Sequence, residues 1–397
     1  MPGCSLGQTS PFVQGDRQRR RQVFLVLVSH NPWLESLARL AIIAVLVPVT
    51  VIILTWVERK VIGRLQMRLG PMRVGPYGTL QGVADTIKLL TKEDVRPQTA
   101  DRWVFELAPF VIVVPVFMAV VAIPFTADLF IQNLTLGVFY FVAVSGLSIV
   151  GFVMAGWGSD NKYALLGGVR AAAQLISYEI PLVMAIVAVA MLSQSLNLAV
   201  IVGAQEDTPN IAFQSLAFLI FAIAGLAELY RQPFDIPVAE SEVVGGPFVE
   251  YSGIRWSMFQ LGEFVNLVLI SILGSLIFLG GWQWPWSVFD ESVPVVAQIV
   301  MMAVKTAAFI LFFMWMRASL PRLRIDQMMS FCWQLLLPFA LLQIIINGLV
   351  LVYDWPNEIL IPLSGAGAAG AVYLTYRAAR ATGVRYQPGY QTVGSVL

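Results

Sequence analysis

The sequence contains few charged residues. Lys, Arg, Asp and Glu together make up 12% of its 397 residues, whereas hydrophobic residues make up 58% and the mean hydropathy is +0.75. Ordinary globular proteins carry about 25% charged residues, so this chain has too little charge to cover a soluble surface. The net charge of +1 also leaves no broad basic surface, which excludes a nucleic-acid-binding protein.

Residues that bind metals or form disulfides are also scarce. The chain has two cysteines, Cys4 and Cys332, and one histidine, His30. An iron–sulfur cluster needs about four cysteine ligands, and a zinc site needs three or four ligands at suitable spacing. We therefore expect no metal site, no cofactor bound by this chain alone and no disulfide framework. If the chain belongs to a redox enzyme, other subunits carry the electrons.

Long apolar runs, in contrast, are abundant. They are continuous over about 20 residues, the length of a transmembrane helix, and do not alternate as the strands of a membrane barrel do. The sequence therefore predicts an all-α integral membrane protein, with one transmembrane domain at 34–378, a leader at 1–33 that is disordered or lies on the surface, and a tail at 379–397. Nine transmembrane helices are expected, at 36–57, 103–124, 134–157, 171–194, 211–230, 256–280, 296–318, 330–352 and 357–377.

The distribution of Lys and Arg supports this number of spans and gives an orientation. The tail and the loops after spans one, three, five and seven contain Lys or Arg, whereas the loops after spans two, four, six and eight contain none. Cytoplasmic loops carry an excess of these residues, so the C-terminus is expected in the cytoplasm and the N-terminus outside. The leader, with Arg17, Arg19, Arg20 and Arg21, disagrees with this orientation.

The first cytoplasmic loop, residues 58–102, begins with the basic run ERKVIGRLQMRLGPMRVGPYG. Gly-Pro occurs twice in this run, and such dipeptides force turns and extended backbone. Apolar residues such as Val61 and Leu65 are mixed with the charges, which suggests a segment packed between the membrane surface and a partner. The alternative is a basic loop that only fixes the orientation of the chain.

The next segment, TLQGVADTIKLLTKE, has helical periodicity. Leu80 and Val83 lie on its apolar face, and Asp85 and Lys88 lie on its polar face. It is too short to cross a bilayer, so the pattern predicts an amphipathic helix in the membrane interface, with Thr79 as its N-cap. Such a helix is either a plain surface anchor or a wall beside an entry for an amphiphilic substrate.

Several ionisable residues fall within or near the predicted spans, although a charge at the bilayer centre costs about 2.5–3.5 kcal/mol. They are Glu179, Glu228, Glu263 and Lys305, with Glu106 at a span boundary. They form either static buried pairs or a polar path through the bundle. Pro181 follows Glu179 closely and frees a backbone carbonyl for water or a polar partner. One alternative pairs Glu228 with Arg231 on the same helical face, and Glu106 is expected to bond locally.

The third cytoplasmic loop, residues 231–255, is the most acidic part of the chain. Its prolines and its Gly-Gly-Pro exclude one regular helix. Its acidic residues are Asp235, Glu240, Glu242 and Glu250. Apolar residues between them indicate a folded loop that serves as a proton-loading funnel or as a docking surface for a basic partner. Calcium binding is a weaker alternative, because no EF-hand spacing is present.

Four long motifs stand out in the chain. They are ERKVIGRLQMRLGPMRVGPYGTLQGVADTIKLLTKE at 58–93, AGWGSDNKYALLGGVRAAAQLISYE at 155–179, AELYRQPFDIPVAESEVVGGPFVEYSG at 227–253 and RASLPRLRIDQMM at 317–329. Together they resemble the H subunit of bacterial NADH–quinone oxidoreductase (respiratory complex I), the counterpart of the mitochondrially encoded subunit one. The resemblance extends from Leu34 to Pro338 and departs from the family at Val238, where Glu is usual, and at Leu229-Tyr230.

The resemblance implies a membrane subunit of a proton-translocating NADH–quinone oxidoreductase in the plasma (inner) membrane. Quinone is then the substrate, no redox centre lies on this chain, and FMN, NAD and the iron–sulfur clusters belong to partner subunits. The implied partners are the soluble iron–sulfur and quinone-site subunits of the hydrophilic arm, together with small and antiporter-like membrane subunits.

The resemblance also assigns site residues. The quinone chamber would be lined by Arg59, Arg64, Leu65, Gln66, Arg68, Leu80, Val83, Asp85 and Lys88. The proton path would comprise Glu179, Glu228, Asp235, Glu240, Glu242, Glu250, Glu263 and Lys305. In the expected mechanism, quinone enters between the first span and the amphipathic helix, and its reduction shifts the protonation of these carboxylates.

Three other functions stay open. One is the membrane subunit of an energy-converting hydrogenase, in which the first loop lacks the doubled Gly-Pro. Another is the corresponding subunit of a ferredoxin-driven type-I dehydrogenase, which the sequence does not distinguish. The third is a free-standing transporter, which predicts inverted repeats with broken helices; the sequence shows no such repeat.

Overall fold

The computed structural model describes residues 32–127, 129–206, 208–237, 244–284 and 294–381. Within these residues the chain is helical and has no strand, apart from one isolated bridge between Pro124 and Phe130. The chain divides into two compact units, one up to Ile53 and one from Leu54 onward. Of the first unit the structure describes the N-terminal part of helix α3 (Pro32–Leu65), and the end of α3 belongs to the second unit.

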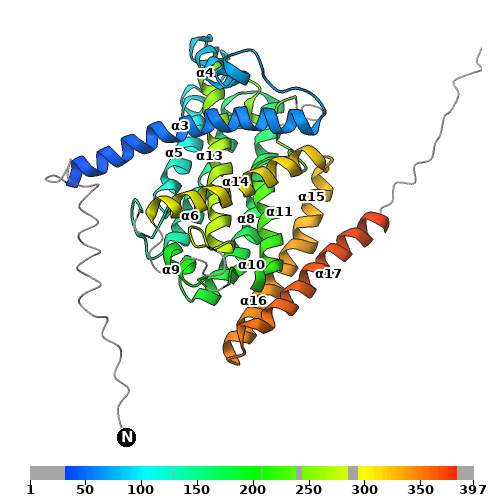
Figure 1. The fold of residues 1–397 in the computed structure, drawn as a ribbon. Helices are drawn as coiled ribbons and strands as arrows, with labels where there is room; N and C mark the ends of the chain where they lie inside the picture. Colours follow the sequence, from blue (N-terminus) through cyan, green and yellow to red (C-terminus); the bar gives the residue numbers. More distant parts are fainter. Residues whose placement is uncertain (1–31, 128, 207, 238–243, 285–293, 382–397) are drawn as a thin grey trace, which may run out of the picture. The chain divides into compact units, whose positions relative to one another are not determined.

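The second unit contains the other helices (Figure 1). The longer ones are α4 (Gln81–Thr91), α5 (Arg102–Val120), α6 (Gly137–Gly146), α7 (Ser148–Gly158), α8 (Lys162–Ser193), α11 (Ser215–Glu228), α13 (Gly253–Phe278), α14 (Val295–Ser319), α16 (Leu337–Val352) and α17 (Leu360–Ala381). The short ones are α9 (Leu198–Gly203), α10 (Asn210–Phe213), α15 (Ile325–Phe331), the 3₁₀ turns η1 (Pro76–Gly78), η2 (Gly246–Phe248) and η5 (Asn357–Ile359), and the π-helical segment η4 (Cys332–Leu336).

Most of the predicted spans coincide with these helices. Among the described residues, 7 helical stretches are long and apolar enough to cross a membrane, and they match predicted spans two to four and six to nine. Predicted span five coincides with α10 and α11, but α11 has only 14 residues, fewer than the about 20 that a bilayer requires. Predicted span one lies in α3. The chain is thus an all-α multi-pass membrane protein, and the number nine stays a prediction.

The packing centre of the second unit is α8, which contacts α7, α11 and α16 along its length. Its residues Ala188 and Val189 are completely buried. Helix α5 packs against α7 where Gly151 faces Ile112, because a Cβ at Gly151 would lie 2.4 Å from Cγ1 of Ile112. Small residues of this kind allow the backbones of membrane helices to approach closely.

The structure differs from the prediction for the first loop in two places. α3 continues to Leu65, so the first residues predicted as loop are helical. The amphipathic helix is confirmed as α4, but Thr79 does not cap it: its backbone N–H bonds to the carbonyl of Pro76, and Thr79 ends the turn η1 instead. Leu80 and Val83 on the predicted apolar face of α4 are exposed in this chain, 53% and 40%, as expected of a helix that lies against a membrane or a partner.

Candidate functional site

Arg231 lies at the centre of a buried group of charged side chains. It follows α11, and its side chain is only 2% exposed. Its Nη1 lies 2.6 Å from Oε1 of Glu58 on α3, and its Nε lies 3.1 Å from Oε1 of Glu263 on α13. Burial lowers the pKa of Arg231, but the carboxylates of Glu263 and Glu58 outweigh burial and raise that pKa above its usual value. The guanidinium therefore stays charged, and its two partners allow it to be buried.

A second arginine completes this group. Arg317 at the end of α14 hydrogen-bonds to Oε1 of Glu58. Nearby in sequence, Arg322 donates to the backbone oxygen of Asp235 and lies 3.7 Å from its carboxylate. The Arg231 cluster, as we call it, consists of Glu58, Arg231, Glu263 and Arg317. It joins α3, α13, α14 and the segment after α11.

Two further carboxylates, those of Glu228 and Glu179, lie close to each other near the Arg231 cluster. Glu228, at the end of α11, is buried, hydrogen-bonds to Asn266 of α13, and is close enough to Glu179 for the two carboxylates to interact. The half-buried Glu179 lies against Gly146 of α6, where a Cβ would be 2.8 Å from its Oε1. The alternative in which Glu228 pairs with Arg231 is wrong, because Arg231 faces Glu58 and Glu263.

Pro181, two residues after Glu179, leaves a backbone carbonyl without its helical donor, as the sequence predicts. Pro181 lies inside α8 and has no N–H, so the carbonyl of Ser177, four residues earlier, lacks its helical donor. The thiol of Cys332 donates to this carbonyl at 3.0 Å. The next residue, Tyr178, donates its hydroxyl to the carbonyl of Met328. The α15–η4 segment is therefore attached to α8 directly beside Glu179.

The acidic loop is attached to the start of α8. Nδ2 of Asn161, the N-cap of α8, donates to Oε1 of Glu250 at 2.7 Å. The backbones also touch, because a Cβ at Gly167 would lie 2.4 Å from Cα of Gly246. Tyr251 stacks on Phe105 of α5 at 4.1 Å between ring centroids, and burial raises its pKa despite nearby positive charge, so its hydroxyl stays protonated. The predicted residues Glu240 and Glu242 lie outside the described residues.

The predicted quinone-side residues lie on the end of α3 and on α4. Arg59 pairs with Asp85 at 2.6 Å, which joins the two helices. Gln66 accepts a hydrogen bond from Nε of Arg68. The remaining predicted residues, Arg64, Leu65, Leu80, Val83 and Lys88, are exposed. Glu58 and Arg59 are adjacent, so the Arg231 cluster begins where this surface ends.

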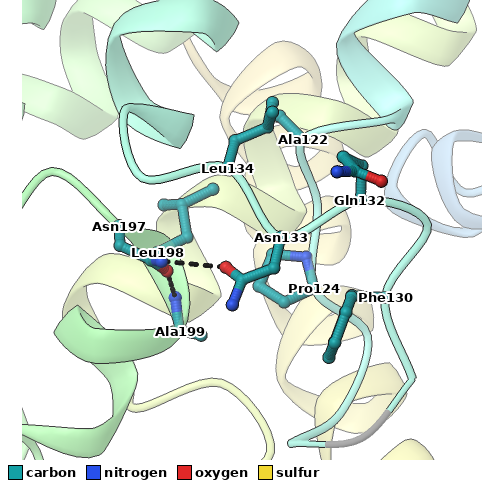
Figure 2. A pocket seen from close by; sticks show the side chains of 9 residues that line it. All are labelled: Ala122, Pro124, Phe130, Gln132, Asn133, Leu134, Asn197, Leu198 and Ala199. Atoms are coloured by element: carbon teal, nitrogen blue, oxygen red, sulfur yellow. Dashed lines mark hydrogen bonds between the residues drawn. The ribbon is translucent and has the colours of Figure 1, made fainter.

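The described part of the second unit includes a small cavity and an open surface hollow. One has a volume of about 10 Å³, beyond the C-terminal ends of α5 and α8, where Asn197 donates to Asn133 at 2.8 Å (Figure 2). It has room for one water molecule. The other is an open surface hollow of about 450 Å³ between the first loop and the acidic loop, lined by Lys92, Glu93, Val95, Pro97, Val249, Glu250, Tyr251 and Ser252.

Two other predicted ionisable residues have partners of different kinds. Glu106 accepts from Arg96 at 2.8 Å and lies 3.6 Å from Arg102, which confirms the expectation of local bonding. Lys305 donates to the backbone carbonyls of Leu279 and Gln283. A static pair between Lys305 and one of the glutamates is therefore wrong. Among the described residues, no group of three His, Cys, Asp or Glu side chains could hold a metal ion.

Sequence reasoning did not select Glu58 or Arg317 as site residues. Both lie at the ends of apolar helices next to other charged residues, so hydropathy placed Glu58 in a basic loop. One signal was available: Glu58 is the single carboxylate in a run that contains several Arg and Lys residues. Which arginines approach it depends on helix packing and is not visible in the sequence.

The fold and the buried charges define a multi-pass helical membrane protein with ionisable groups inside its bundle. Comparison with known proteins gives its family. The chain belongs to the NADH dehydrogenase family, whose sequence profile matches residues 38–348.

Similar proteins, each named as the H subunit of NADH-quinone oxidoreductase, occur in several bacteria. That of Brevibacillus brevis is 48% identical over 297 residues, 75% of this chain and 87% of the relative. That of Dehalococcoides mccartyi strain CBDB1 is 43% identical over 347 residues, 87% of this chain and 96% of the relative. That of Geobacillus kaustophilus is 50% identical over 294 residues, 74% of this chain and 87% of the relative.

Proposed function

We propose that this chain is a membrane subunit of a proton-pumping NADH–quinone oxidoreductase, and that it couples quinone reduction to proton translocation. Family membership and the names of the relatives support this proposal. The multi-pass helical fold agrees with a place in the plasma (inner) membrane. The distribution of Lys and Arg favours a cytoplasmic C-terminus and an N-terminus outside.

One observation carries the coupling role. A single buried guanidinium, that of Arg231, contacts two carboxylates. One is that of the buried Glu58, next to the proposed quinone-side residue Arg59, and the other is that of Glu263 on α13. A change of charge near Glu58 alters how strongly Arg231 is attracted to Glu58, and so how strongly it stabilises the charge of Glu263. The Arg231 cluster therefore offers a direct electrostatic connection between the proposed quinone side and the proposed proton path.

In the proposed mechanism, quinone approaches between the last turns of α3 and α4. Its apolar tail lies on the exposed Leu65, Leu80 and Val83, and its headgroup moves to a neighbouring subunit. There it accepts two electrons from that subunit and two protons, and becomes quinol. The resulting change of charge shifts protonation along the proposed proton path, which comprises Asp235, Glu240, Glu242 and Glu250, then Glu263, Glu228 and Glu179.

The chain has two cysteines, fewer than the about four that an iron–sulfur cluster needs. Cys332, the cysteine within the described residues, is buried and donates its thiol to Ser177. We therefore place FMN, the NAD site and the iron–sulfur clusters in partner subunits. Those partners are the soluble subunits of the hydrophilic arm and the small and antiporter-like membrane subunits, and quinone is the substrate.

The test is a pull-down of the tagged full chain in mild detergent, with the companions identified by mass spectrometry. Iron–sulfur subunits together with antiporter-like membrane subunits are the expected result, and a nucleotide-binding flavoprotein among them would establish NADH as donor. A nickel–iron hydrogenase would indicate the energy-converting hydrogenase instead. A tagged chain that leaves the membrane without any companion subunit would overturn the subunit proposal and favour a transporter.

A further inference from the structure

The C-terminal end of α13 is buried inside the protein. Phe278, its last residue, is 0% exposed, and Trp282 beyond it is 7% exposed. The last four carbonyls of a helix have no donor within the helix, and an unpaired carbonyl away from water is unfavourable. The surrounding chain must therefore supply donors to this helix end.

The first donors come from the turn that follows α13. The backbone N–H groups of Leu279 and Gly281 both donate to the carbonyl of Ser275, at 3.1 and 2.8 Å. Gly280 and Gly281 have φ values of +72° and +50°, a conformation that glycine adopts without strain. The turn thus folds back onto the helix end, as at many helix C-termini.

Two amide side chains supply the next donors. Nε2 of Gln205, just after α9, donates to the carbonyl of Leu276 at 2.9 Å. Nδ2 of Asn210, at the start of α10, donates to the carbonyl of Ile277 at 3.0 Å. Gln205 and Asn210 are also bonded to each other, because the backbone N–H of Asn210 donates to Oε1 of Gln205. Helices α9 and α10 therefore pack on the end of α13 (Figure 1).

Lys305 on α14 completes the set. Its Nζ donates to the carbonyl of Leu279, which follows α13, and to the carbonyl of Gln283, each at 2.6 Å. Lys305 lies well inside α14, about 15 Å from the first residue of that helix at about 1.5 Å per residue. A positive charge is stabilised at the C-terminal end of a helix, where the helix dipole is negative.

We infer that Lys305 is a charged cap of the buried end of α13, a positioning residue that fixes this helix, and not a member of the proton path. The capping role stands on the contacts of Lys305 alone. By fixing α13, Lys305 also helps to keep Glu263 next to Arg231. The exclusion of Lys305 from the proton path rests on the proposed function.

The region between Lys305 and Glu263 supports this reading. The two sites are separated by about 24 Å along α13, at about 1.5 Å per residue. Of the polar side chains between them, Asn266 hydrogen-bonds to Glu228. Ser271 and Ser275 donate their hydroxyls to carbonyls of their own helix. The hydroxyl of Ser275 also lies 3.4 Å from that of Thr306 on α14. Most other residues of this stretch are apolar and buried, and Leu273 is 0% exposed.

The first experiment measures thermal unfolding of the purified full chain in lipid nanodiscs. Lys305→Met is expected to lower the midpoint by about 2–6 °C, because two partly buried carbonyls lose their donor. Lys305→Arg, which keeps the charge and can donate to both carbonyls, is expected to recover most of the loss. Lys162→Met, which removes an exposed lysine at the start of α8, is the matched control and should leave the midpoint unchanged. An unchanged midpoint for Lys305→Met would overturn the cap.

A double variant tests whether the donors act on the same helix end. If Gln205→Leu already weakens the packing of the C-terminal end of α13, the additional loss of stability from Lys305→Met should be smaller. The midpoint shift of Gln205→Leu with Lys305→Met is therefore expected to be smaller than the sum of the two single shifts. A fully additive result would show that the two side chains act independently, and would overturn a shared cap.

The second experiment separates the cap from a proton relay. In the assembled enzyme, the number of protons moved per electron is compared between the wild type and Lys305→Met. A cap leaves this ratio unchanged in the enzyme that still assembles, with less than wild-type enzyme in the membrane. A lowered ratio would overturn the exclusion of Lys305 from the proton path. Failure of the proposed function would appear as absent companion subunits and would leave the unfolding result of the isolated chain intact.

Discussion

Nη1 of Arg231 lies 2.6 Å from Oε1 of Glu58, and both side chains are almost completely buried. The two residues lie far apart in the sequence, on the segment after α11 and on α3. Their contact fixes the end of α3 to the centre of the bundle. Because Glu263 contacts the same guanidinium, this one ion pair connects two regions that sequence reasoning had assigned to separate tasks.

Removal of the central cation should be strongly destabilising. Arg231→Leu leaves the buried Glu58 and the half-buried Glu263 without their shared counter-charge, and breaking a buried pair costs about 3–5 kcal/mol. We expect a large loss of folded chain in the membrane, measured by quantitative immunoblotting and by thermal unfolding. Glu58→Gln should recover part of the loss in the Arg231→Leu background, because it removes a buried carboxylate that is then left with Arg317 as its one cation. Wild-type stability of Arg231→Leu would contradict the buried cluster.

Glu179 tests the proposed proton path. Glu179→Gln keeps the shape and the hydrogen-bonding capacity of the side chain but removes its ability to exchange a proton. Proton pumping linked to quinone reduction should fall, while the amount of assembled enzyme stays at the wild-type level. The matched control is Glu106→Gln, a carboxylate that bonds locally to Arg96 and Arg102 and should keep full pumping. Full pumping in Glu179→Gln would remove this residue from the path.

Cys332 and Pro181 should show coupled effects on stability. Cys332→Ala removes the donor to the carbonyl of Ser177, and a buried acceptor without a partner costs about 1–3 kcal/mol. Pro181→Ala restores a backbone N–H at the position that serves this carbonyl in a regular helix. The cost of Cys332→Ala in thermal unfolding should therefore be smaller in the Pro181→Ala background. Cys332→Ser, which keeps a donor, is the control; equal costs in both backgrounds would argue against this coupling.

The contact between α8 and the turn η2 should not tolerate a methyl group. Gly167→Ala would place its Cβ 2.4 Å from Cα of Gly246, so the backbone has to move, at a cost of about 1–3 kcal/mol. Gly203→Ala in α9 is the control, because its Cβ would meet nothing within 4 Å, and it should be neutral or slightly stabilising. The measurement is thermal unfolding of both variants, and equal midpoints would refute the close contact.

The fold could be predicted from the sequence to a large extent, because apolar length and the distribution of Lys and Arg report directly on the bilayer. The amphipathic helix was also visible, since the periodicity of its apolar residues is local. The N-cap was not: Thr79 is used by the preceding turn, whose Gly75 and Tyr77 have positive φ values. Such competition between adjacent turns depends on backbone geometry that composition does not reveal.

The candidate site was only partly predictable. The sequence indicated that Glu228, Glu263 and Lys305 need partners, because a buried charge always does. It did not indicate which partners, since Glu228 has Arg231 three residues away and yet faces Asn266. The choice is made by helix packing, which turns Arg231 toward α3 and α13.

The order of synthesis gives the Glu58–Arg231 contact a place in the biogenesis of this chain. Glu58 leaves the ribosome well before Arg231 and Arg317, the two cations that compensate it. A carboxylate without a counter-charge stays in contact with water, because burying it alone costs several kcal/mol. We therefore expect the end of α3 to remain hydrated while the next helices are inserted, and to pack onto the bundle only after Arg231 has been made. A nascent chain that stops before Arg231 should keep Glu58 accessible to water-soluble carboxylate reagents, whereas the finished chain should protect it.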